Sequence, residues 1–124
     1  MSVGTIKGLR DTLIADLAVV GVPVMDDWQV RAEPPCILVG PPRAGPYVTA
    51  GIAFGSYLLS TTVTVLVEMG PDARDRLETL LEEVLRNSAD WALADADAPG
   101  AQSVEDSTVE FLSSVVHLEK SFHL

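Results

Sequence analysis

Acidic side chains gather in one short stretch of the chain, where oxygen ligands for a cation could converge. Asp95 and Asp97 precede Pro99 and Gly100, and Asp106 follows. The order partly fits the calcium loop of an EF-hand, in which spaced carboxylates, a glycine turn and a closing carboxylate surround the ion. Pro99 stands where a third oxygen ligand belongs, and a strand-like pattern follows where the EF-hand has a helix. The stretch is therefore predicted to be an ordinary polar loop.

The two histidines, His117 and His123, are the other candidates for a metal site. They lie six residues apart in a strand-like stretch, so a straight strand would hold them about 20 Å apart at ~3.3 Å per residue. Two ligands of one ion must lie within a few ångströms of each other. We therefore predict surface or interface histidines, no metal site and no cofactor.

No arrangement of residues in the chain matches a known catalytic motif. The single cysteine, Cys36, begins an apolar run that ends at Val39, so we expect a buried and inert thiol. The chain has no Gly-x-Ser-x-Gly and no Cys–His signature. Glycines recur between Gly51 and Gly55, but the lysine and helix of a phosphate-binding loop do not follow. The sequence therefore predicts no catalytic residue and no enzymatic activity.

Composition narrows the class of protein. A chain of 124 residues, 48% of them hydrophobic, is enough for one globular domain, here residues 1–124. The formal net charge of −10 disfavours a grip on nucleic acid, which needs basic side chains facing the phosphates. It equally disfavours docking on an anionic membrane. No apolar run is long enough to span a bilayer, so we expect synthesis in the cytoplasm and no membrane partner.

The elements that must position any site centre on a strand followed by a helix. From Tyr57 to Glu68 the odd positions are almost all apolar and the even positions mostly polar, which predicts one buried and one wetter face. Gly70 and Pro71 then start a predicted amphipathic helix. Six residues are predicted to form one core between them: Leu59, Val63, Val65, Leu77, Leu81 and Val84. We expect Leu81→Ala to cost about 2–5 kcal/mol of stability.

The remaining segments complete an α+β fold. They are a helix capped by Ser2 or Thr5 and ended by Gly21, strands at Val22–Trp28 and Cys36–Val39, a loop at Ala94–Ala101, and two C-terminal strands, Ser103–Phe111 and Ser114–His123, with a register change between them. The expected architecture is a mostly antiparallel sheet of about four to five strands. Two helices pack on one face of it.

The segment from Gly40 to Ser56 is too rich in proline and glycine for a helix or a central strand, so it predicts a long loop or a projecting hairpin arm. It nevertheless carries four large apolar or aromatic residues and one arginine: Tyr47, Val48, Ile52, Phe54 and Arg43. A loop surrounded by solvent gains nothing from such apolar side chains. Aromatic residues and arginine are enriched at protein interfaces. We predict that these five residues form an assembly surface; the alternative is that the arm folds back on its own sheet.

The layout resembles that of the tail terminator proteins of long-tailed bacteriophages, minor tail proteins of the tail-to-head joining type. The residues that carry the resemblance are Pro35-Cys-Ile-Leu-Val-Gly-Pro-Pro42, the strand Thr61-Thr-Val-Thr-Val-Leu-Val67, and the helical stretch Asp72 to Leu85 that starts directly after it. The resemblance covers nearly the whole chain and is one of layout, since no diagnostic motif is present.

That resemblance implies a structural virion protein at the head-proximal end of the tail. It implies a homo-oligomeric ring, typically of six copies, that caps the tail tube protein and meets the head-completion or connector protein. DNA would pass through the ring without specific binding, and an acidic wall is compatible with that passage. Three alternatives stay open: another head-completion or neck protein, a small ligand-binding or regulatory module, and an enzyme with an unrecognised site.

Overall fold

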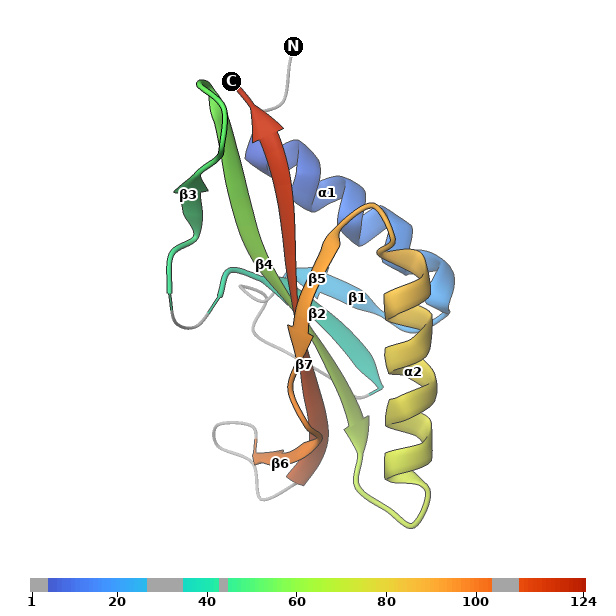
Figure 1. The fold of residues 1–124 in the computed structure, drawn as a ribbon. Coiled ribbons are helices and arrows are strands. Elements are labelled where there is room, and N and C mark those ends of the chain that lie inside the picture. The colour runs from blue at the N-terminus through green and yellow to red at the C-terminus, as the bar shows by residue number, and fades with distance from the viewer. Residues whose placement is uncertain (1–4, 27–34, 43–44, 104–109) are drawn as a thin grey trace.

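The computed structural model describes residues 5–26, 35–42, 45–103 and 110–124. They form one mixed sheet of seven strands with two helices on one of its faces (Figure 1). The elements in chain order are α1 (Thr5–Leu17), a short 3₁₀ helix η1 (Ala18–Val20), β1 (Val24–Asp26), β2 (Cys36–Gly40), β3 (Val48–Ala50), β4 (Ser56–Glu68), α2 (Ala73–Asn87), β5 (Ala92–Ala96), β6 (Gly100–Ser103) and β7 (Glu110–His123). The predicted α+β class is confirmed, with more strands than expected.

Two long strands, β4 and β7, form the middle of the sheet. They pair antiparallel along their whole length, from Ser56 opposite His123 to Glu68 opposite Phe111. The outer edge of β4 pairs with β2 and β3, and the outer edge of β7 pairs with β5 and β6. Strand β1 lies beside β2 and is parallel to it, while the other pairs are antiparallel. A long two-stranded ribbon therefore carries shorter strands along both sides.

A register change was expected between two C-terminal strands, Ser103–Phe111 and Ser114–His123, and this expectation is wrong. Residues 104–109 of the first expected strand lie outside the described residues. Strand β7 pairs with β4 without a shift. Phe111 contributes to a small cluster with Cys36 and Leu66, whereas Val116 and Leu118 lie in the main core. Because side chains alternate along a strand, the two clusters lie on opposite faces of the sheet. One strand with two apolar faces thus produces the pattern that suggested two strands.

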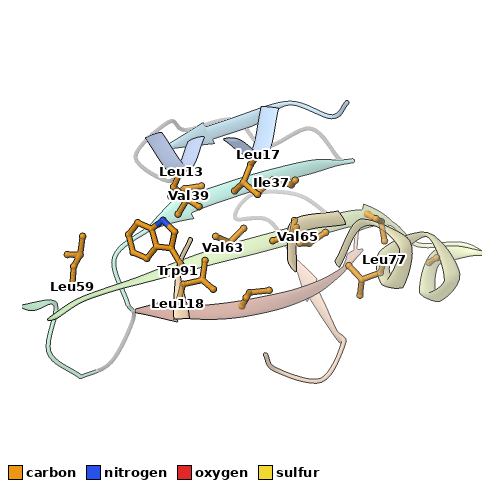
Figure 2. Close-up of a cluster of buried hydrophobic side chains, with 14 of the residues drawn as sticks. Leu13, Leu17, Ile37, Val39, Leu59, Val63, Val65, Leu77, Trp91 and Leu118 are labelled. Atoms are coloured by element: carbon orange, nitrogen blue, oxygen red, sulfur yellow. The ribbon is translucent and has the colours of Figure 1, made fainter. Parts of the chain in front are cut away.

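The main core lies between the sheet and the helices (Figure 2). Five of the six predicted core residues are buried there: Leu59, Val63, Val65, Leu77 and Val84. Leu81 is only partly buried and packs against this core. Truncating a buried side chain costs more stability when it leaves a larger cavity. Among the residues of α2, we therefore expect truncation of Leu77 to cost the most.

Both helix ends near the core have identifiable causes. The N-terminal helical segment, α1 followed by η1, ends at Gly21, whose φ of 91° is the left-handed conformation that glycine adopts without strain. Helix α2 begins at Ala73, two residues later than predicted from Pro71. The Ala73 N–H donates to the Gly70 carbonyl (3.1 Å) and closes a turn that separates strand from helix.

The even face of β4 was expected to be the wetter one, and this is also wrong for its second half. Thr62, Thr64 and Leu66 are all buried. The hydroxyl of Thr62 donates to the Gly40 carbonyl at 3.1 Å, and the Thr61 hydroxyl donates to the same oxygen at 2.8 Å. Thr62 can thus lie on a buried face, because its hydroxyl has an acceptor at the end of the neighbouring strand β2.

Cys36 is completely buried, as predicted, and burial raises the pKa of its thiol. The thiolate is the reactive form, so native protein at mildly alkaline pH should react with Ellman's reagent about 100-fold or more slowly than protein unfolded in guanidinium. The absorbance of the released thiolate measures both rates. A native rate equal to the unfolded rate would contradict a buried thiol.

In the part of the chain that the structure describes, no helix is both long enough and apolar enough to cross a membrane. This agrees with the absence of a long apolar run in the sequence.

Candidate assembly surface

The predicted arm has two parts: its first part is a strand of the sheet, and its second part is a turn beyond that strand. Strand β3 pairs antiparallel with residues 57–59 of β4, and the Ser60 N–H donates to the Tyr47 carbonyl at 2.9 Å. The segment therefore folds back on its own sheet as far as Ala50. The turn that follows, residues 51–55, lies at one end of the sheet beside the C-terminus (Figure 1). We call this turn the hairpin tip.

The hairpin tip is held by several hydrogen bonds. The Gly51 N–H donates to the Ser56 carbonyl (2.9 Å), and the Ser56 hydroxyl donates to the Ala53 carbonyl (2.6 Å). The Leu124 N–H at the C-terminal end donates to the Gly55 carbonyl (3.0 Å). Gly55 itself adopts a positive φ of 74°. Such a turn has little conformational freedom left to lose when it binds something.

Two large apolar side chains stand on this tip with nothing covering them. Ile52 and Phe54 are 109% and 104% exposed, the full value for an isolated side chain. Val48, the first residue of β3, and Tyr47, directly before it, are exposed to a smaller degree. Arg43, the fifth predicted residue of this surface, lies outside the described residues. The described residues of the predicted set thus share one hairpin, and the two most exposed share its tip.

The start of β4, directly after the hairpin tip, is anchored against the core. The Tyr57 and Phe122 rings stack with centroids 5.6 Å apart, and Phe122 is buried. Stacked aromatic pairs add to the stability gained by burial alone. The position of the tip is therefore fixed relative to the sheet.

Gly51 has a steric reason to be glycine. A Cβ at this position would lie 2.2 Å from the Ser56 hydroxyl oxygen and 3.0 Å from the Ser56 carbonyl carbon. We expect Gly51→Ala to displace the tip and to cost about 1–3 kcal/mol of unfolding free energy, as overpacked sites do. Urea denaturation measures the loss.

Gly8 provides the matched control for that substitution. It lies in α1 with no atom close to its would-be Cβ, so Gly8→Ala should be neutral or stabilising. Equal stability of Gly51→Ala and the wild type would show that the tip tolerates a Cβ.

A second group of polar side chains, in which Asp95 and Asp97 lie beside His117, was not predicted. Both aspartates were expected in a loop, and this is wrong for Asp95, which lies in strand β5 (Ala92–Ala96), where a bulge between Leu93 and Asp95 brings it opposite His117 of β7. Asp97 lies directly after β5, outside a strand, as expected. The His117 Nε2 lies 3.3 Å from Asp97 Oδ1 and 3.7 Å from Asp95 Oδ1.

The sequence gives no sign that these residues lie together, because His117 is 20 positions from Asp97 and only strand pairing brings them close. Asp106, the closing ligand of the calcium pattern, lies outside the described residues. His123 is exposed near the C-terminus and does not belong to the group.

An apolar groove of about 370 Å³ lies beside the first turns of α2. Val22, Pro35, Val67 and Leu80 contribute its apolar lining, and Arg76 lies at it with one guanidinium nitrogen donating to the Glu68 carbonyl at 3.0 Å. A small apolar ligand could fit such a groove.

The chain matches no model of a known protein family, and no curated protein matches it.

Proposed function

We propose that this chain is a structural, non-catalytic subunit of a phage tail. In this proposal several copies, six by the resemblance in layout, form a ring that caps the tail tube and joins it to the head connector. The observation that carries the proposal is the hairpin tip, where a constrained turn holds Ile52 and Phe54 in solvent.

The energetics of the tip favour a protein partner. Fully burying one side chain of this size contributes about 1.5–3 kcal/mol. Because the turn is already held by its own hydrogen bonds, little of that gain is lost in ordering the hairpin. A ring places the same tip in every contact between neighbours, so a modest gain recurs around the assembly.

The charge of the chain fits passage of DNA through such a ring. With a net charge of −10, the subunit has no excess of basic groups to hold phosphates. An acidic wall repels DNA and lets it slide, so the proposed partners are protein: further copies of the chain, the tail tube protein and the head-completion or connector protein.

The groove beside α2 favours a second candidate, a small ligand-binding or regulatory module. Its lining is apolar, with Asp75, Arg76 and Thr79 as the polar groups that could orient a ligand. A ligand-binding module does not need to form a ring, so oligomeric state separates the two candidates.

Native mass spectrometry over a series of micromolar to millimolar concentrations tests the proposal, with and without tail tube protein. We expect one closed oligomer, with a mass close to six chains, and no open-ended series of larger species. A chain that stays monomeric at every concentration, and also in the presence of tail tube protein, would overturn the ring and favour the ligand-binding module.

A further inference from the structure

The three side chains gathered by β5 and β7 have the geometry of a metal site. A ring nitrogen of His117 and one oxygen each of Asp95 and Asp97 all lie within 4.8 Å of one another. Protein nitrogen and oxygen ligands lie about 2.0–2.2 Å from Zn²⁺, which puts two ligands of a tetrahedral ion roughly 3.3–3.6 Å apart. The two distances from Nε2, 3.3 and 3.7 Å, lie close to that range.

The backbone around the site holds the ligands in place from two strands. The Asp97 N–H donates to the Val115 carbonyl at 2.8 Å, and the Ser114 hydroxyl donates to the Asp97 carbonyl at 2.7 Å. His117 lies on β7, where it is paired with Thr62 on one side and with Asp95 on the other. Asp95 and His117 are opposite each other on paired strands, and Asp97 is tied to β7 by these two hydrogen bonds, so only small movements are needed to close around an ion.

The donor set selects the class of ion. Imidazole favours zinc and related transition metals, whereas sites for magnesium or calcium are built from oxygen alone. One nitrogen with two carboxylates also brings two negative charges, which offset the charge of a divalent ion. Asp95 and Asp97 are exposed, so water can take the remaining coordination positions.

We propose that Asp95, Asp97 and His117 bind one divalent transition-metal ion of the zinc class. This goes beyond the ring proposed above and does not depend on it, because the ligands lie on β5, directly after it and on β7, whereas the hairpin tip lies between β3 and β4. It also revises the expectation of no metal site, which considered His117 only together with His123.

The competing explanation is a simple ion pair, in which protonated His117 bridges the two carboxylates. Ion pairs between exposed groups contribute little to stability. Metal binding differs from such a pair in a measurable way, because an ion binds a site with a defined stoichiometry, whereas an ion pair takes up no metal.

Isothermal titration of zinc chloride into the full chain, free of affinity tags and of bound metal, tests the site at neutral pH. We expect one ion per chain for the wild type. His117→Ala should bind zinc about tenfold or more weakly, because one of three protein ligands is lost. His123→Ala is the matched control: it removes the other histidine, which lies outside the group, and should bind as the wild type does.

Asp97→Asn gives an independent second variant, and circular dichroism confirms that each protein is folded. It removes one carboxylate charge and should also weaken zinc binding. The absence of saturable binding by the wild type would overturn the site and leave the ion pair. Equal affinity of His117→Ala and His123→Ala would overturn it as well. If His117→Ala does not fold, His117→Gln replaces it, and unchanged zinc affinity of that variant would count against the site.

Discussion

Replacing Ile52 and Phe54 together by serine is expected to abolish self-assembly while leaving the subunit folded. Both side chains are fully exposed in the single chain, so the fold loses no packing when they are shortened. A contact between subunits that buries both loses roughly 3–6 kcal/mol, which lowers its association constant by about two to four orders of magnitude.

The masses of wild type and double variant, measured at the same concentrations, provide the readout. Val19→Ser is the matched control, since it removes an exposed aliphatic side chain (72% exposed) from η1 instead of the hairpin tip. We expect the control to assemble as the wild type does. If the double variant forms the same oligomer, the tip is not the interface, and the unpaired sheet edges become the next place to search.

Leu77→Ala is expected to have the largest effect on stability. Its side chain is completely buried between α2 and the sheet (Figure 2), and truncating such a leucine costs about 2–5 kcal/mol. A domain of this size has only about 5–15 kcal/mol of unfolding free energy in total, so the variant should unfold at much lower urea concentration.

Leu93→Ala provides the control for this substitution, because Leu93 is 52% exposed and should change stability by less than about 0.5 kcal/mol. Leu81→Ala should fall between the two, since Leu81 is only partly buried. A loss at Leu77 no larger than the loss at Leu93 would mean that α2 does not cover the sheet as described.

The parts of the fold that sequence predicts well are those with long periodic patterns. The alternation of β4 and the three-and-four spacing of α2 each extend over more than ten residues, so both elements were predicted, although the start of α2 was placed two residues early. Strands β3, β5 and β6 have three to five residues each, rich in alanine, glycine and polar side chains. They form because β4 and β7 offer long free edges, which local sequence does not reveal.

The two candidate sites also differ in how far the local sequence reveals them. Ile52 and Phe54 could be selected from sequence because large apolar residues contrast with the proline and glycine around them. The group formed by Asp95, Asp97 and His117 depends on the register of β5 against β7, including its bulge. A shift of one residue would send His117 to the other side of the sheet relative to Asp95, so only the paired structure identifies this group.

Electron microscopy of tail tubes mixed with the purified chain tests the central proposal most directly. Tail tube protein is polymerised alone, the chain is added, and the tube ends and tube lengths are recorded. We predict a ring at one end of each tube and no further growth from that end, with the Ile52→Ser/Phe54→Ser variant unable to cap. Tubes that lack an added ring and continue to lengthen in excess wild-type chain would contradict a tail-capping function.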